Sequence, residues 1–141
     1  MPVRPPLSGV LETVLYFVSE DETKRFYTEV MGMRLLGEAK GRHIFFRAGR
    51  SVFLLFNPHA TSRPDTLPAH GATGDGHVCF LVPASSYQQW KEYLPAQGVE
   101  ILREISWPMG KPEDQSEGSS IYFRDPSGNL LEIANADFWP K

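Results

Sequence analysis

The stretch that decides the fold lies near the end of the chain and reads Ile121-Tyr122-Phe123-Arg124-Asp125-Pro126-Ser127-Gly128-Asn129-Leu130-Leu131-Glu132-Ile133. Apolar and aromatic runs flank a central Asp-Pro-Ser-Gly, which predicts two strands joined by a tight turn. The second strand carries one carboxylate, Glu132, into apolar surroundings. A degenerate copy at 44–49 and 52–56 has no such carboxylate. The repeat predicts a duplicated fold, and the difference between the copies predicts a site at Glu132.

The rest of each half repeats one order of patterns. A strand at 10–18 precedes a helix of about twelve residues, with Ser19 and Glu22 as a capping box and Gly32 at its end. The second half has a strand at 77–82 and a helix from a possible capping box at 85–88 to Gly98. The remaining strands are expected at 33–38, 43–48 and 51–57, then at 99–104, 120–124 and 129–134. The chain is therefore predicted to be β-α-β-β-β, linker, β-α-β-β-β.

These patterns predict one α+β domain over residues 1–141. Module one covers about 9–57, a Pro- and Gly-rich linker about 58–74, and module two about 75–136. Glu12 and His77 are 65 residues apart, and Gly32 and Gly98 are 66 apart. Module two carries an insertion at 106–118, in a loop rich in Gly, Pro and Ser.

Composition bounds the function. The net charge is −3 and the pI about 5.8, which argues against a nucleic-acid partner. The longest apolar runs are strand-sized, so no membrane span is expected. The start of the chain lacks the apolar region of a signal peptide, and the single cysteine cannot form an internal disulfide. We therefore expect a cytoplasmic protein.

Alternation along the strands predicts which side chains share a face. In the first strand, Leu15 and Phe17 are expected beneath the helix, and Glu12, Val14 and Tyr16 on the opposite, concave face. In module two, His77 falls at the Glu12 position, with Cys79 and Glu132 on the same face. Three potential metal ligands, Glu12, His77 and Glu132, are therefore predicted to face one concavity.

The arrangement resembles the vicinal oxygen chelate superfamily, which includes glyoxalase I, extradiol dioxygenases, fosfomycin-resistance and bleomycin-resistance proteins. The resemblance covers about residues 9–137 and rests on a few motifs. They are Glu12 to Val18, Phe26-Tyr27 with Gly32, Gly76-His77-Val78, and Phe123 to Asn129 before Glu132. It implies tandem βαβββ modules that form a concave, partly open mixed-sheet barrel with helices outside, and a homodimer.

The resemblance also implies a metal site. Ligand positions of the family match Glu12, His77 and Glu132, and the fourth position falls at Leu54 or Leu55, which cannot bind a metal. Three ligands with open positions are typical of a catalytic centre. Two carboxylates and one imidazole suit one divalent ion: Zn, Mn, Fe, Ni or Mg.

Two functions remain open. The first is a metal-dependent enzyme of glyoxalase type, a lyase or isomerase, in which the metal chelates vicinal oxygens and Glu132 or Glu12 is the catalytic base. Dioxygenase-like chemistry is disfavoured, because Glu12 replaces a histidine. The second is a bleomycin-resistance-like protein that sequesters a small molecule without metal or catalysis.

Other chemically distinctive side chains have simpler interpretations. We expect ion pairs at the equivalent Arg47 and Arg124, and a small buried thiol at Cys79. The remaining expectations are core positions for Phe45, Phe53 and Tyr122, and loop or strand-edge positions for His43, His59 and His70. Trp107, Pro108 and Met109 are expected either in a pocket wall or in an exposed or dimer-contact loop.

Overall fold

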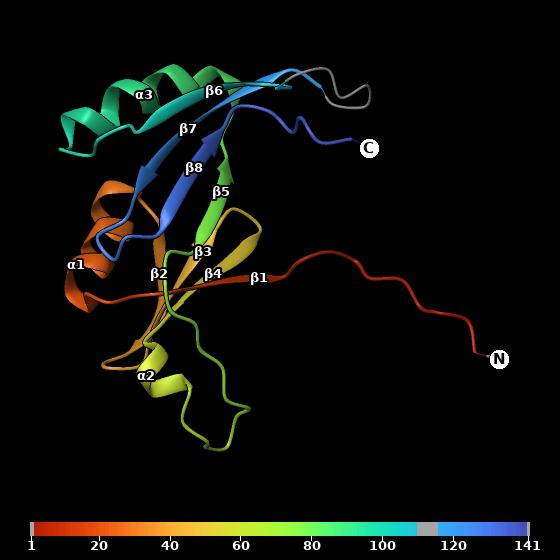
Figure 1. The fold of residues 1–141 in the computed structure, drawn as a ribbon, viewed down its shortest axis with the longest axis vertical. Helices are drawn as coiled ribbons and strands as arrows, with labels where there is room; N and C mark the ends of the chain where they lie inside the picture. The colour runs from red at the N-terminus through yellow and green to blue at the C-terminus, as the bar shows by residue number, and fades with distance from the viewer. Residues whose placement is uncertain (1, 110–115, 141) are drawn as a thin grey trace.

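The computed structural model describes residues 2–109 and 116–140 and contains two four-stranded sheets (Figure 1). The predicted insertion at 106–118 includes residues 110–115, which lie outside the described part. Module one holds β1 (Glu12–Tyr16), α1 (Glu20–Arg25), η1 (Phe26–Val30), β2 (Arg34–Ala39), β3 (His43–Ala48) and β4 (Ser51–Phe56), followed by α2 (Pro58–Thr61). Module two holds β5 (His77–Leu81), η2 (Ala84–Ser86), α3 (Tyr87–Ala96), β6 (Arg103–Trp107), β7 (Gly118–Arg124) and β8 (Leu130–Ala134).

Both sheets have the same topology. The strand order is β1-β4-β3-β2 in one and β5-β8-β7-β6 in the other. The pairs β1–β4 and β5–β8 are parallel, and the other pairs are antiparallel. This match confirms the predicted duplication and the α+β class. Within the described residues no strand pairing joins the two sheets, so they do not close into a barrel.

Strand register settles the correspondence between the modules. Val14 pairs with Leu54 across β1 and β4, and Cys79 pairs with Glu132 across β5 and β8. Since Val14 and Cys79 lie at equivalent places in their strands, Leu54 rather than Leu55 is the counterpart of Glu132. The buried Leu55 faces the core instead, with 0% of its surface exposed.

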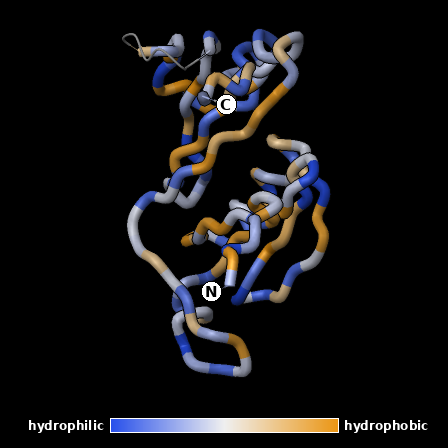
Figure 2. The backbone as a smooth tube through the Cα atoms, turned by 90° about the vertical axis from the view of Figure 1, so that its right-hand side faces the viewer, coloured by the Kyte–Doolittle hydropathy of each residue, from blue (hydrophilic) through white to orange (hydrophobic). Residues whose placement is uncertain are grey.

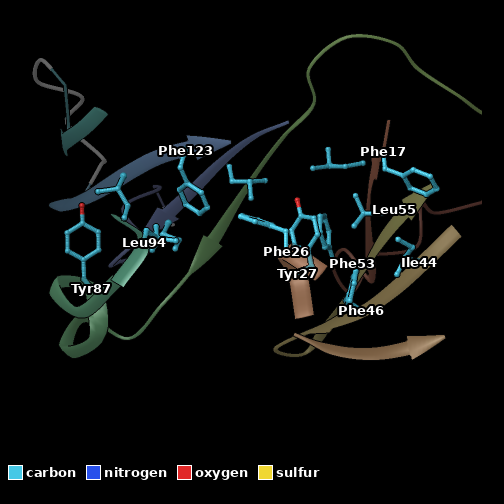
Figure 3. Packing of buried hydrophobic residues seen from close by; sticks show 14 residues of the cluster. Phe17, Phe26, Tyr27, Ile44, Phe46, Phe53, Leu55, Tyr87, Leu94 and Phe123 are labelled. Carbon is cyan, nitrogen blue, oxygen red and sulfur yellow. The ribbon is translucent and has the colours of Figure 1, made fainter. Parts of the chain in front are cut away.

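The core lies on the helix-bearing face of each sheet. Leu15 and Phe17 are buried as predicted, at 6% and 4% exposure. The apolar faces predicted for the two helices are confirmed, because Tyr27 of η1 and Leu94 of α3 are fully buried. Figure 3 shows side chains of both modules in one cluster, and Figure 2 shows apolar residues in orange along the strands.

The two modules contact each other through this core. Phe53 of β4 and Phe80 of β5 meet edge to face, with ring centroids 5.5 Å apart. The buried Tyr27 hydroxyl donates to the Asp125 carboxylate at 2.7 Å. The Tyr93 hydroxyl of α3 donates to the Val30 carbonyl of η1 at 2.8 Å. Aromatic and hydrogen-bonded contacts therefore fix the modules against each other.

The first helix differs in detail from its prediction. It begins as expected after Ser19, but it continues from Phe26 as a π-helix, and Gly32 follows with φ 69°. The Ser19 side chain makes no capping hydrogen bond. Instead, the Ser127 hydroxyl of module two accepts from the Val18 backbone N–H at 2.9 Å and meets the Thr23 hydroxyl at 2.7 Å. A contact distant in sequence thus replaces the local capping box.

Two further elements differ from expectation. The linker contains α2, where Asn57 caps the helix by accepting from the His59 N–H at 3.0 Å and Pro58 occupies the first turn. The strand predicted at 99–104 is shifted to β6, Arg103–Trp107. The Val99 N–H still bonds to the Leu94 carbonyl at the end of α3, so sheet pairing starts later.

Candidate metal site

His77 and Glu132 form the centre of the candidate site. His77 opens β5 and Glu132 lies in the neighbouring parallel strand β8, two pairs further along. The His77 Nε2 atom is 3.3 Å from the Glu132 Oε1 atom. Glu132 is 5% exposed, whereas 46% of the His77 side chain is exposed. The site is therefore a buried carboxylate whose open side faces an accessible imidazole.

Backbone contact fixes the orientation of the imidazole. The His77 Nδ1 atom is 2.9 Å from the Leu130 carbonyl oxygen, which can only accept a hydrogen bond. A proton on Nδ1 leaves Nε2 as the lone-pair nitrogen of neutral His77, directed at the carboxylate. Metal-binding histidines are held by this type of second contact. A lone-pair nitrogen and a carboxylate oxygen at 3.3 Å repel each other unless a cation or a proton lies between them.

Two further side chains flank the carboxylate across the sheet. Register places Cys79 on one side of Glu132 and Tyr122 on the other. Burial, then the nearby Glu132 carboxylate and its hydrogen bond, raise the pKa of the Cys79 thiol to about 12. Burial and Glu132 also raise the pKa of Tyr122, against the opposing effect of its hydrogen bond with Ser120. Both groups stay protonated near neutral pH and are potential hydrogen-bond donors to the carboxylate.

The sequence predicted the face of Cys79 correctly, but it misplaced Tyr122 and predicted the wrong exposure for Cys79. Tyr122 was expected in the core, but it lies half-buried on the site face, and its ring lies nearly parallel to the His77 ring, with centroids 6.2 Å apart. Cys79 was expected to be buried, but the residue is exposed at the edge strand, and only its thiol is partly shielded from solvent beside Glu132. The signal was available for Tyr122, because residues opposite each other in antiparallel strands share a face.

Glu12 does not join this pair within one chain. It lies exposed at the start of β1, paired with Val52 in the other sheet. Across residues 2–109 and 116–140, no group of three or more His, Cys, Asp or Glu side chains could hold a metal ion. The structure therefore assembles two of the three predicted ligands and leaves the third on module one.

The equivalent face of module one is aromatic instead of acidic. The His43 and Phe45 rings stack with centroids 4.1 Å apart and an 8° interplanar angle. The Tyr16 hydroxyl meets the His70 Nδ1 atom at 2.7 Å, and His70 lies edge-on against Phe56 at 4.7 Å. This face could line a substrate pocket, but it supplies no carboxylate at the Leu54 position.

The equivalent arginines also differ. Arg124 Nη1 forms the expected ion pair with Asp75 at 3.1 Å and donates to the Gly128 carbonyl at 2.8 Å. For Arg47 the ion-pair prediction is wrong: within the described chain it reaches only the Arg50 and Ser51 carbonyls, each at 3.5 Å.

No helix among the described residues is long and apolar enough to cross a bilayer.

Comparison with solved structures identifies close likenesses. Lactoylglutathione lyase from Agrobacterium tumefaciens superposes with a TM-score of 0.85 at 34% identity, covering 96% of this chain and 98% of that one. Fosfomycin resistance protein FosX from Listeria monocytogenes, a mutant complexed with Mn(II) and 1S,2S-dihydroxypropylphosphonic acid, has a TM-score of 0.65. Its identity is 20%, over 93% of this chain and 92% of that one, which shows the shared fold alone.

Sequence comparison finds metallothiol transferases. FosB from Staphylococcus epidermidis is 35% identical over 57 residues, which are 40% of this chain and 36% of that protein. FosB from Staphylococcus saprophyticus is 26% identical over 121 residues, 85% of this chain and 72% of that protein. A family model matches residues 10–133, nearly the whole of both modules. The chain belongs to the Glyoxalase/Bleomycin resistance protein/Dioxygenase superfamily.

Proposed function

We propose that this protein is a metal-dependent enzyme of glyoxalase type that acts on a small substrate with vicinal oxygens. The observation that carries the proposal is the pair formed by the His77 Nε2 and Glu132 Oε1 atoms, 3.3 Å apart on one sheet face. The likeness to lactoylglutathione lyase favours a lyase or isomerase. Metal chemistry is supported by the metallothiol transferase FosB and by the FosX structure, which contains Mn(II). Dioxygenase-like activity is less favoured than lyase or isomerase activity.

The donor set fits one divalent ion. Bonds of about 2.1 Å in a tetrahedral centre place neighbouring ligand atoms ~3.4 Å apart, close to the observed 3.3 Å between nitrogen and oxygen. The Leu130 carbonyl holds the imidazole in the required orientation. Burial of Glu132 at 5% exposure makes an uncompensated carboxylate costly, and a bound cation would offset that cost. Zn, Mn, Fe, Ni and Mg all remain compatible with these ligands.

We infer that a second copy of the chain supplies the third ligand. Glu12 is exposed on β1, an edge strand, and His77 is on β5, the edge strand of the other sheet. These edges carry exposed apolar residues, since Val14 is 36% exposed and Leu81 is 66% exposed. Exposed edges with apolar side chains are typical of an association surface. A homodimer that pairs β1 of one copy with β5 of the other would bring Glu12 to His77 and Glu132.

The chemistry follows from these residues. When bound, the metal would act as a Lewis acid toward two adjacent substrate oxygens. Glu132 or Glu12 would remove a proton from the neighbouring carbon, because a carboxylate held near an acidified proton is an effective general base. Tyr122 and Cys79 would remain protonated and orient the Glu132 oxygens. The aromatic face of module one, with Tyr16, would line the pocket of the same composite site.

Metal content and metal-dependent stability test the proposal. Purified protein stripped with a chelator should bind one divalent ion per chain, and added Mn²⁺ or Zn²⁺ should raise its melting temperature. Glu12→Ala, His77→Ala and Glu132→Ala should each abolish the stabilisation. Glu100→Ala, at an exposed glutamate outside the site, is the matched control and should behave as the parent protein.

Mixing experiments test the composite site. Glu12→Ala and Glu132→Ala homodimers should both be inactive, whereas a mixed dimer should regain one intact site and about half of the activity per dimer. Activity is screened with 1,2-dicarbonyl adducts, 2-oxoacids and catechols. Ligand binding that persists without metal and in all three variants would instead identify a sequestering protein and overturn the proposed enzyme.

A further inference from the structure

A cavity of about 800 Å³ lies at the junction of the two modules, along the edge strand β5. It is bounded by the segment after η1, the β3–β4 hairpin, β5 and α3. Ile133 lines it and Glu132 does not, although Cys79, the neighbour of Glu132 across the strand pair, is among the lining residues. His77 is also absent from its lining. The cavity therefore borders the candidate metal site at Cys79 but does not include the His77–Glu132 pair.

Three guanidinium groups distinguish this cavity. Arg34, Arg47 and Arg50 all line it, and no Asp or Glu is among its described lining residues. Arg34 and Arg47 are direct partners across β2 and β3, a position in which like charges repel. Among the ion pairs of the described residues, none includes any of these three arginines. In a chain of net charge −3, this is a local excess of uncompensated positive charge.

The remaining wall is apolar. Met31 and Met33 come from the segment that follows η1, Phe80 comes from β5, and Trp90 comes from α3. Methionine side chains adapt to ligands of different shape, and an indole offers a flat contact surface. A cavity of this volume falls in the range that encloses a drug-sized molecule. The site thus combines an apolar wall with a cationic side.

We propose that this cavity binds a small organic anion, with an acidic head group at the three arginines and an apolar body against Met31, Met33, Phe80 and Trp90. Arginine forks pair with carboxylate and phosphate oxygens, so both head groups share the recognising chemistry. The ligand would relieve the repulsion between Arg34 and Arg47. The site contains none of the three proposed metal ligands and lies at the junction of the two modules.

Titration of the full-length protein with octanoate and octyl phosphate tests the proposal. Binding is followed by calorimetry and by the amide and indole signals of Trp90 in two-dimensional NMR. The Trp90→Phe variant identifies these signals, because its indole signal is missing. Octanoate or octyl phosphate should bind at least about tenfold more tightly than octanol, which lacks the charge. The tighter of the two anions identifies the head group. Equal binding of octanol, or no Trp90 perturbation at millimolar anion, would overturn the proposal.

Matched arginine variants localise the effect. Arg34→Gln combined with Arg50→Gln should weaken anion binding by about tenfold or more, because both residues line the cavity. Arg25→Gln combined with Arg63→Gln removes the same charge from exposed positions outside it and should leave affinity within about twofold. Equal losses in the two double variants would show a general charge effect and contradict a built site. Glu132→Gln should leave anion binding unchanged, which separates this test from that of the metal site.

Discussion

The two modules share a backbone plan and differ in one row of side chains across the sheet. In module one the row is Val14, Leu54 and Phe45, and in module two it is Cys79, Glu132 and Tyr122. One row is aliphatic and aromatic, and the other surrounds a buried carboxylate with two protonated donors. The two modules therefore have the same strand register. The proposed metal chemistry depends on the central residue of the row, which is Leu54 in module one and Glu132 in module two.

Transfer of the module one residue to module two should have the largest effect. Glu132→Leu removes a proposed ligand, so affinity for Mn²⁺ or Zn²⁺ should fall by at least about 100-fold. The metal-free protein should become more stable by about 1 kcal/mol, because an apolar side chain replaces a buried charge. Metal titration and chemical denaturation measure the two quantities. Loss of stability together with unchanged metal affinity would contradict a functional role for Glu132.

The reverse transfer should destabilise module one. Leu54 is 7% exposed, and Leu54→Glu would bury a carboxylate beside Val14 and Phe45, which offer no hydrogen bond. The free energy of unfolding should fall by about 2–4 kcal/mol. Leu36→Glu, at a residue that is 41% exposed, is the control and should cost less than about 1 kcal/mol. Similar losses in both variants would show that the Leu54 environment tolerates charge.

Packing between the modules gives the next effect. A methyl group on Gly76 would lie 2.6 Å from Leu15 Cδ2 and 3.0 Å from Asn129 Oδ1. Gly76→Ala should therefore lower the free energy of unfolding by about 1–3 kcal/mol. Gly37→Ala meets no atom within 4 Å and has no positive φ, so it is the matched control. A neutral Gly76→Ala would mean that the module junction can widen without cost.

Tyr27 tests the polar part of the same junction. Burial, followed by the adjacent Asp125 charge, raises the pKa of Tyr27 well above its ordinary value, so its hydroxyl remains a donor. Tyr27→Phe leaves Asp125 Oδ2 with the Asn129 amide, which donates at 3.0 Å. The expected loss is about 1–2 kcal/mol in the free energy of unfolding. Tyr16→Phe, which removes an exposed hydroxyl bonded to His70, should change it by less than about 0.5 kcal/mol.

The smallest expected effect concerns thiol reactivity. With the pKa of Cys79 raised to about 12, little thiolate exists at pH 8, so alkylation should be slow and should speed up as pH rises. Glu132→Gln removes one cause of the raised pKa, and alkylation at pH 8 should accelerate by about three- to tenfold. Glu104→Gln is the control, because that carboxylate pairs with Lys91. An unchanged rate in Glu132→Gln would contradict the electrostatic contact.

Periodicity was sufficient for the duplicated topology, the faces of β1 and the equivalence of Glu12 with His77. Local patterns failed where distant contacts decide the outcome. Ser19 and Glu22 matched a capping box, but the Ser19 side chain makes no cap, and the Ser19 N–H donates instead to the Ser127 hydroxyl of the other module at 3.4 Å. The separation of Glu12 from Glu132 could not be predicted, because alternation gives the face of a strand and not how two sheets are placed. The gathering of Arg34, Arg47 and Arg50 around one cavity could not be predicted for the same reason.

The turn between β7 and β8 has a consequence for the two halves as folding units. Besides Ser127, its Asn129 side-chain amide donates to the Tyr16 carbonyl at 2.9 Å, and Asp125 accepts from Tyr27. The connection between β1 and α1 is therefore completed by atoms that lie more than a hundred residues away. Although the modules share one topology, neither should fold autonomously. Fragments separated within 62–74 should be largely unstructured alone and should regain structure when mixed.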